Sequence, residues 1–467
     1  MPDFLYLPLQ QHAGSPAIAL VAPGDQVKKG QLIAEAEGRT SAPIHAPTSG
    51  EVVSIDQHVA PHPSGLPGAA IVIKPDGNDE WCSFSAVEDP WNLPPDELAR
   101  KIEDAGVVGM GGAAFPSAVK LGQARGKVDT VIINGAECEP YLTCDDRLMQ
   151  ERADDVVSGI RLMLHTVGAK RALIGIEANK PIAAKKMRDA SAHVDFIDVV
   201  VVPTRFPTGS GKQLTYVLTG REVPAGGRSH DAQIIVHNVA TAAAVHDALI
   251  EGRPLLSRIV TVAGGALSAA ANYEALLGTP VQHLLECVGQ KMPPARLVLG
   301  GPMTGHALFS DLTPVVKGTC GVLALTAEEI GASQESPCIR CGSCVDACPM
   351  GLVPLEMASH IKADDAKGAG AWGLSDCILC GCCSYTCPSH IPLVHYFQFG
   401  RDQLKAKKAD ERRSKEILQR IGDRTDRIER LAAEKKAQAK ARAAERAAAR
   451  KKKQAAKARA QTTGGNA

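Results

Sequence analysis

Nine of the fourteen cysteines in this chain fall into two short runs whose spacing is suited to metal chemistry. Residues 338–349 read CIRCGSCVDACP and residues 377–388 read CILCGCCSYTCP, so both contain C-x2-C-x2-C-x3-C-P. Thiolates with two other residues between them can surround one face of a metal centre. The turn at each Pro makes it difficult for the fourth thiolate to reach the same centre. We therefore expect two adjacent thiolate-bound centres that pass single electrons.

This spacing is the signature of bacterial ferredoxins with two [4Fe–4S] clusters, in which the fourth Cys of each run binds the other cluster. On that rule, one cluster would be held by Cys338, Cys341, Cys344 and Cys387. The second cluster would be held by Cys377, Cys380, Cys383 and Cys348. Zinc also uses C-x2-C pairs, but it rarely needs three thiolates in one tight run followed by Cys-Pro. Disulfides are disfavoured, because so dense a thiol cluster without a secretory signal indicates metal binding.

The composition is that of a globular chain with many turns. Of 467 residues, 45% are hydrophobic, 44 are Gly and 30 are Pro, and the length predicts about three or four domains. The start, MPDFLYLPLQQ, has neither the basic residues nor the apolar core of a signal peptide. No apolar run approaches the roughly 18 residues of a membrane helix. We expect a cytoplasmic protein, or one on the cytoplasmic face of a membrane, where thiols stay reduced.

The charge is unevenly distributed. Residues 401–467 contain 22 Lys or Arg and 9 Asp or Glu, a net charge of +13, while the whole chain carries only +1. This basic, Ala/Lys/Arg-rich tail is expected to be helical or disordered. It could contact anionic lipid head groups or an acidic partner. Nucleic acid is disfavoured as a partner, because no base-stacking aromatic residues accompany the basic ones.

Residues 1–80 alternate short apolar runs with Gly, Pro and Asp turns, which predicts a small β-sandwich or barrel. PGDQVKKGQ (23–31) and APTSGEVVSI (46–55) resemble the two halves of a biotinyl/lipoyl-type barrel-sandwich module. In those carriers, a Lys at a hairpin tip is acylated, whereas the tip here reads EGRTS (37–41). We therefore expect a docking or packing domain instead of a carrier.

Residues 81–250 show a different periodicity. Short β-rich apolar runs alternate with helical patterns such as residues 148–167, which predicts an α/β domain with a largely parallel sheet. The four expected strands lie at residues 129–136, 171–177, 196–203 and 233–240.

Two loops of this domain could bind a ligand. GVVGMGGAAFPSAVKLG (106–122) has glycines that allow close approach of a phosphate or a flat ring, and it precedes a helix N-terminus. INGAECEPYLTCDDR (133–147) follows a strand, where α/β folds place ligands, and it carries Glu137 and Glu139. Taken alone, the first loop is equally compatible with a simple tight turn. The second loop, taken alone, is better explained as a solvated loop with a capping acid.

Together, the loops resemble the NADH-binding flavoprotein subunit of respiratory complex I, and more closely the RnfC family of Rnf ion-translocating electron-transport complexes. A glycine loop, an Asn-x-x-Glu-x-Glu-Pro loop, a Gly-x-Glu strand end and an Asn-Val-x-Thr segment match in that order. They occupy residues 109–120, 134–140, 175–177 and 237–241. The resemblance extends to about residue 400 and includes the barrel-sandwich start, TGREVPAGG (219–227) and the cysteine runs.

The resemblance implies that NADH gives a hydride to non-covalently bound FMN, so that no catalytic side chain is required. Glycine backbone and Lys120 would hold the phosphate, Phe115 would form an aromatic wall, and Asn and Glu side chains would supply hydrogen bonds. The implied cofactor-binding residues are Gly109, Gly111, Gly112, Ala113, Phe115, Lys120, Asn134, Glu137, Glu139, Gly175, Glu177, His237, Asn238 and Thr241.

Two positions depart from the related families. Ala136 stands where the complex I flavoprotein has an acid, so one contact near the flavin or nicotinamide is lost. Gly211 stands where an acid is expected in the Rnf family. The surrounding FPTGSGKQL (206–214) is not a P-loop, because position 206 is Phe and position 213 is Gln.

The expected fold class is therefore multidomain, α/β and α+β, in five segments. They are a barrel-sandwich domain (1–80), an FMN/NADH-binding α/β domain (81–250), an SLBB-type β-grasp module (251–330), a ferredoxin-like two-cluster domain (331–400) and the basic tail (401–467). The β-grasp assignment rests on the resemblance, since such a module follows the flavin domain in both relatives.

The main interpretation is a peripheral electron-input subunit of a membrane-bound Rnf-type complex, on the cytoplasmic face of the bacterial inner membrane. It would exchange electrons with a ferredoxin-like iron–sulfur subunit, and membrane partners would move the ion. Two alternatives stay open. One is a soluble NADH-linked subunit of a hydrogenase or dehydrogenase. The other is a non-catalytic iron–sulfur relay whose flavin site has decayed, which Ala136 favours.

Overall fold

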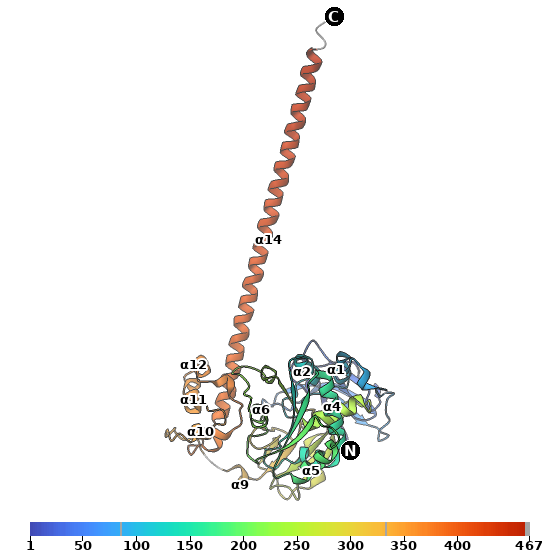
Figure 1. Ribbon diagram of the computed structural model, residues 1–467, viewed down its shortest axis with the longest axis vertical. Helices are drawn as coiled ribbons and strands as arrows, with labels where there is room; N and C mark the ends of the chain where they lie inside the picture. Colours follow the sequence, from blue (N-terminus) through green and yellow to red (C-terminus); the bar gives the residue numbers. More distant parts are fainter. Residues whose placement is uncertain (85, 332–333, 463–467) are drawn as a thin grey trace.

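Four β-sheets and one very long helix organise the described part of the chain, which comprises residues 1–84, 86–331 and 334–462 of the computed structural model. Figure 1 shows the sheets gathered in one body, the helices of the cysteine-rich segment beside it, and the long helix projecting away from both.

Two small sheets form the N-terminal domain. Their strand orders are β1-β7-β6-β3 and β2-β4-β5, and every pairing is antiparallel. Pairing of Leu5 with Ile73 and of Leu7 with Ile71 places four fully buried side chains between the sheets. The strands are β1 (Leu5–Pro8), β2 (Ile18–Ala19), β3 (Gln26–Val27), β4 (Leu32–Glu35), β5 (Ile44–His45), β6 (Gly50–Val59) and β7 (Pro67–Pro75).

The four strands predicted for the α/β domain are all present, and they form one parallel sheet of order β10-β9-β8-β11. Their near-continuous Val and Ile content is explained by burial on both faces. Helix α6 covers one face, through Leu214, and the remaining helices pack on the other. The strands are β8 (Thr130–Gly135), β9 (Arg171–Glu177), β10 (Ile197–Val202) and β11 (Ile234–Asn238).

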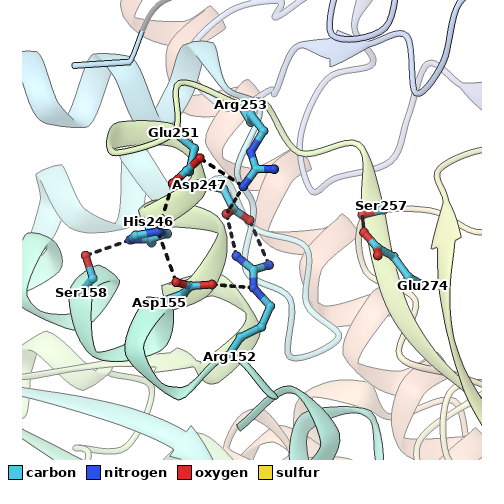
Figure 2. A network of polar contacts seen from close by, with 9 residues as sticks. All are labelled: Arg152, Asp155, Ser158, His246, Asp247, Glu251, Arg253, Ser257 and Glu274. Atoms are coloured by element: carbon cyan, nitrogen blue, oxygen red, sulfur yellow. Dashed lines mark hydrogen bonds and ion pairs between the residues drawn. The ribbon is translucent and has the colours of Figure 1, made fainter. Parts of the chain in front are cut away.

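The helical segment expected at 148–167 divides into two helices at Arg152, whose backbone (φ −129°, ψ 38°) is not helical. At this break, the Arg152 guanidinium donates to Asp155 at 2.7 Å and to Asp247 at 2.6 Å, as Figure 2 shows. The break thereby ties the start of α4 to the end of α7. The helices are α1 (Pro95–Asp104), α2 (Ser117–Ala124), α3 (Cys144–Glu151), α4 (Ala153–Val167), α5 (Pro181–Ser191), α6 (Gly211–Thr219) and α7 (Val239–Leu249), with 3-10 turns η1 (Pro90–Asn92) and η2 (Ser229–Ala232).

A mixed five-stranded sheet of order β13-β12-β16-β14-β15 occupies the segment where a β-grasp module is expected. Helix α8 (Val281–Val288) packs its buried face, with Leu284 and Leu285, into the core of this sheet. The strands are β12 (Ser257–Ala263), β13 (Ala271–Leu276), β14 (Arg296–Leu299), β15 (His306–Ala307) and β16 (Gly321–Leu325).

Short helices surround the cysteine runs, and Phe397, which is fully buried, lies in their common core. The elements are α9 (Ala327–Ile330), α10 (Ser343–Asp346), α11 (Pro354–Lys362), α12 (Ala366–Ala371), η3 (Leu374–Asp376), α13 (Cys382–Tyr385) and the start of α14 (Leu393–Thr462). Cys344 lies in α10 and Cys383 in α13, and the other six predicted cysteine ligands lie in the segments between the helices.

The basic tail is helical within the described residues, as the continuation of α14. Its first turns are anchored through Leu393 and Phe397, and residues 405–459 are all exposed. Within residues 1–84, 86–331 and 334–462, none of the helices combines the length and the apolar character needed to cross a membrane.

Lys317 joins three of these domains. It lies in the sheet domain that contains β12–β16, it is fully buried, and its Nζ donates to the carbonyl of Pro43 at 2.6 Å and to that of Gly106 at 2.7 Å. Pro43 belongs to the N-terminal domain and Gly106 to the α/β domain. Burial lowers the pKa of Lys317 to about 7.

Lys317→Met is expected to lower the free energy of unfolding by about 2–5 kcal/mol, because two buried carbonyls lose their donor. The pKa of the folded state lies below that of an unfolded lysine. The unfolded chain therefore binds more protons between about pH 7 and pH 10, and wild-type stability should rise with pH across that window. Urea unfolding at several pH values tests both effects. The exposed Lys74→Met is the matched control, and an equal loss in both variants would contradict the role of Lys317.

Candidate functional site

The glycine loop after α1 is fixed at its ends and open in its middle. The Gly109 N–H donates to the Phe115 carbonyl at 2.8 Å, which closes the loop. The Met110 N–H donates to Thr241 Oγ1 at 3.0 Å, and the Arg258 guanidinium donates to the Met110 carbonyl at 3.2 Å. Gly112 has φ +96°, and nothing lies within 4 Å of the position that a Cβ would occupy. Bare backbone therefore faces open space here.

Glu137, in the loop after β8, caps the N-terminus of α3. Its carboxylate accepts from the N–H of Asp145 at 3.0 Å and from that of Asp146 at 3.3 Å. Lys180 Nζ lies 3.7 Å from the same carboxylate. Burial raises the pKa of Glu137, and the helix N–H groups and Lys180 act in the opposite direction. The loop predicted from Asn-x-x-Glu-x-Glu is therefore held by a helix terminus.

Asp145 is a site residue that sequence reasoning missed. Its carboxylate accepts from Asn238 Nδ2 at 2.5 Å, while Asn238 Oδ1 accepts from the Ala240 N–H and so caps α7. Burial, and then the nearby Glu137 carboxylate, raise the pKa of Asp145 to about 7. The available sequence signal was the Asp-Asp pair at the start of α3. It did not single out a ligand site, because acidic residues at a helix start also stabilise the helix terminus.

Asn134 and Glu139 bring further loops to the same place. Asn134 Nδ2 donates to the Gly209 carbonyl at 2.8 Å. Glu139 accepts from the Met303 N–H at 3.0 Å and from the Thr304 hydroxyl. The loop after β8 therefore connects the segment before α6 with the turn between β14 and β15.

These loops enclose a cavity of about 1030 Å³, called the central cavity below. It lies at the carboxyl ends of β8 and β11, where parallel sheets place ligands. Seven of the predicted cofactor residues line it: Gly111, Gly112, Ala113, Asn134, Glu137, Glu139 and Asn238. Its size and its bare backbone fit a flavin nucleotide.

The other predicted residues lie behind this wall. Lys120, expected near a phosphate, donates instead to the Val236 carbonyl on β11. Gly175 gives α6 room to pack, since a Cβ there would lie 2.8 Å from Leu214 Cδ1. Thr241 holds the glycine loop through the Met110 N–H. The predicted residues that are not part of the cavity wall are Gly109, Phe115, Lys120, Gly175, Glu177, His237 and Thr241.

The N-terminal domain also forms part of the wall. Residues 8–13 and 60–62 line the central cavity, and so do residues 299–301 and 318–320 of the sheet domain. The docking or packing domain expected from the sequence thus contributes to a ligand-sized site. No sequence motif indicated this contact, because it joins segments that lie about 50 to 300 residues apart.

The eight predicted cysteine ligands gather in two groups that match the predicted cross-ligation. A cavity of about 210 Å³, the first cysteine cavity, is lined by Cys338, Cys341, Cys344 and Cys387. A smaller one, the second cysteine cavity, is lined by Cys348, Cys377, Cys380 and Cys383. Nowhere in the described residues do three or more His, Cys, Asp or Glu side chains form a group that could hold a single metal ion.

The two cysteine runs have the same local geometry. Arg340 (φ +55°) and Leu379 (φ +56°) occupy equivalent left-handed positions, and a glycine with φ +83° follows two residues later in each run. The N–H of Arg340 donates to Cys338 Sγ and that of Leu379 to Cys377 Sγ, both at 3.4 Å. N–H donors to sulfur are typical of cluster-binding loops.

The second cysteine cavity is lined by four thiol side chains, a donor set used by iron–sulfur clusters and by zinc. Burial, and then the thiols of Cys377, Cys380 and Cys348, raise the pKa of Cys383 to about 12. The Cys383 thiol would therefore lose its proton only beside a cation such as a bound metal.

The second cysteine cavity lies next to the central cavity, because Ile378 and Cys380 line the central cavity. Asp376, just before the second run, fixes this arrangement. Its carboxylate accepts from Lys212 Nζ at 3.2 Å and from the Gly226 N–H at 2.9 Å. Lys212 is on α6, which Figure 1 places beside the helices of the cysteine-rich domain.

Comparison with known protein families agrees with this architecture. Residues 1–78 match a family described as RnfC barrel sandwich hybrid domain, residues 102–247 match the Nuo51 FMN-binding domain, and residues 337–391 match a 4Fe-4S dicluster domain. Among solved structures, an NAD+-reducing [NiFe]-hydrogenase in the H2-reduced state is 19% identical, with a TM-score of 0.44, over 52% of this chain and 48% of that chain.

Two curated relatives are both named as the RnfC-type component of an ion-translocating oxidoreductase complex. The protein of Rhodobacter capsulatus is 51% identical over 407 residues, which cover 86% of this chain and 78% of the relative. That of Serratia proteamaculans is 44% identical over 92% of this chain, and the match spans 61% of its length. With its barrel-sandwich, FMN-binding and dicluster domains, the chain belongs to the RnfC family of ion-translocating oxidoreductase complexes.

Proposed function

We propose that this protein exchanges hydride with NADH or NAD+ at FMN in the central cavity. It passes single electrons through two [4Fe–4S] clusters to or from a ferredoxin-like partner subunit, at the cytoplasmic face of the membrane. The observation that carries the proposal is that Cys380 and the glycine loop line the same cavity. FMN, when bound, supplies the hydride chemistry and the change from paired to single electrons.

The chain's own residues position the nucleotide and control its surroundings. Gly112 allows a close approach of the ligand to the backbone, and Asn134 and Asn238 hold the loops around it. The Asp145 carboxyl, with a pKa of about 7, can hold or release a proton at the cavity wall near neutral pH.

The geometry supports an order for the two clusters. Cys348, Cys377, Cys380 and Cys383 would hold a cluster beside the central cavity, and that cluster would be the first to exchange electrons with FMN bound there. The other cluster lies nearer the surface, since Cys338 and Cys341 are exposed, and it faces the partner subunit. Ile339, between these two cysteines, is also exposed.

Membership of the RnfC family favours the membrane complex over a soluble hydrogenase or dehydrogenase subunit. FMN binding distinguishes the main proposal from the second alternative, a relay with a decayed flavin site. Ala136, which kept that alternative open, is buried at the cavity wall.

Gly112→Ala is expected to weaken FMN binding about tenfold, because a side chain at φ +96° costs about 1–2 kcal/mol and displaces the loop. Flavin fluorescence titration of the anaerobically purified chain measures this change. Gly77→Ala is the matched control, since Gly77 has φ +80° and open surroundings but lies outside the cavity. Equal FMN affinity in both variants would contradict a binding role for the loop. A wild-type chain without FMN would favour the decayed site.

Cys380→Ala and Cys341→Ala should each lower the iron content by about half, because each removes one ligand of a different cluster. Only Cys380→Ala should abolish the NADH-dependent bleaching of the remaining cluster, which dithionite should still reduce. Cys382→Ala is the control, since Cys382 is outside both predicted ligand sets. If Cys341→Ala abolished the bleaching and Cys380→Ala did not, the proposed cluster order would be wrong.

The end of α14 is proposed to contact anionic lipid, because residues 435–462 contain eleven Lys or Arg and one acidic residue. Each basic residue near an anionic surface contributes about 1 kcal/mol at low salt. Deleting residues 435–467 should lower the affinity for phosphatidylglycerol vesicles at least about tenfold, with binding that weakens as salt increases. Phosphatidylcholine vesicles are the control. Undiminished binding of the shortened chain would place the membrane contact elsewhere.

A further inference from the structure

The large apolar residues in the exposed length of α14 are concentrated in one short stretch. Residues 405–459 contain five of them, and all five fall between positions 417 and 431. The rest of this length consists mainly of charged residues, Ala and Gln. A helix that only projects into solvent does not need such a concentration, which indicates a contact surface. The five side chains, each between 48% and 68% exposed, are Ile417, Leu418, Ile421, Ile428 and Leu431.

Four of these side chains belong to a regular stripe along one face of the helix. The stripe has the spacing of a coiled-coil seam, in which successive positions lie alternately four and three residues apart. We call it the α14 seam, and it consists of Ile417, Ile421, Arg424, Ile428 and Leu431. The middle position of an otherwise apolar seam is therefore an arginine.

Two further arginines lie beside this seam. Arg420 and Arg427 occupy equivalent positions along one edge, seven residues apart. The corresponding positions on the other edge, 418 and 425, are Leu and Thr, which carry no charge. None of the three arginines takes part in an ion pair within the described part of the chain. A ligand that covers the seam therefore meets three positive charges and no negative charge at its centre and edges.

These charges disfavour a second copy of the chain as the partner. In a parallel pair of α14 helices, Arg424 would face Arg424. In an antiparallel pair, the edges that carry Arg420 and Arg427 would face each other. Like charges at these places oppose pairing. A lipid surface is also disfavoured, because Arg424 lies inside the apolar face that would have to enter the hydrocarbon region.

A partner with carboxylates meets the requirements of the seam. Covering the seam buries four large apolar side chains, which is favourable, but it also removes the Arg424 guanidinium from water. A carboxylate can accept two hydrogen bonds from that guanidinium and offset this cost. The stripe spans only two heptads, which is short for an independent coiled coil. The partner must therefore be held nearby by other contacts, as subunits of one complex are.

We propose that the α14 seam binds an amphipathic helix of another subunit of the ion-translocating complex. This partner helix presents apolar side chains to the isoleucines of the seam and a carboxylate to Arg424. Further carboxylates face Arg420 and Arg427. The contact holds the middle of α14, between the cysteine-rich domain and the basic end of the helix. It does not depend on FMN or on either cluster.

Site-specific photocrosslinking in the intact complex tests this proposal. p-Benzoylphenylalanine is introduced at position 418, on the edge of the seam, or at position 419, on the opposite face of α14. Membranes that contain the complex are then irradiated. We expect position 418 to crosslink to one other subunit and position 419 not to do so. Mass spectrometry of the crosslinked peptide should find apolar residues at helical spacing, with Asp or Glu beside them.

Charge reversal tests whether Arg424 selects the partner. Arg424→Glu should lower crosslinking from position 418 by about tenfold or more, because it removes one member of a buried charge pair. Changing the facing acid of the partner to Arg should restore crosslinking. Arg430→Glu is the matched control, since it reverses the same charge on the opposite face of the helix, and its crosslinking should equal that of the wild type. Equal iron content in all variants excludes misfolding of the cysteine-rich domain.

The proposal fails if position 418 gives no crosslink, or if positions 418 and 419 crosslink equally. Crosslinks to lipid, or between two differently tagged copies of this chain, would identify another occupant of the seam and overturn it. Unchanged crosslinking in Arg424→Glu, or an equal loss in Arg430→Glu, would show that the seam arginine does not select an acidic partner.

Discussion

The buried ammonium group of Lys317 is the constraint on which the arrangement of the domains depends. It serves two carbonyls from two domains while its own backbone belongs to a third. A buried donor of this kind fixes relative position more strictly than apolar contact, because hydrogen bonds have defined directions and lengths. The central cavity is bounded by the same three domains, so its shape depends on this junction.

The site is built from loop ends that are held by helix termini. Glu137 caps α3 and Asn238 caps α7, and each also contributes to the cavity wall. Parallel strands bring these termini to one edge of the sheet, and the cysteine-rich domain docks at the same edge through Asp376. Ligand site and second cysteine run are therefore neighbours, although 235 positions separate Asp145 from Cys380.

The strands of the α/β domain were predicted well from sequence, because they follow from local apolar runs. Each expected cysteine group joins three cysteines of one run to the fourth of the other, so it came from the ferredoxin pattern and not from local spacing. The two cysteine cavities are lined by the same groups. The direction of Lys120 could not be predicted, because the carbonyl of Val236 that attracts it comes from a strand over 100 residues away. Local pattern identifies loops, while tertiary packing decides which of their side chains face the ligand.

Helix α14 has a mechanical consequence that follows from its length. At about 1.5 Å per residue, its 70 residues extend roughly 105 Å, and only its first turns are anchored in the cysteine-rich core. The basic end of α14, and any surface that it contacts, is therefore held far from the metal-binding loops. A tilt of a few degrees where the helix leaves the domain would move its far end by several ångströms, so small changes in how that domain docks become large displacements at the helix tip.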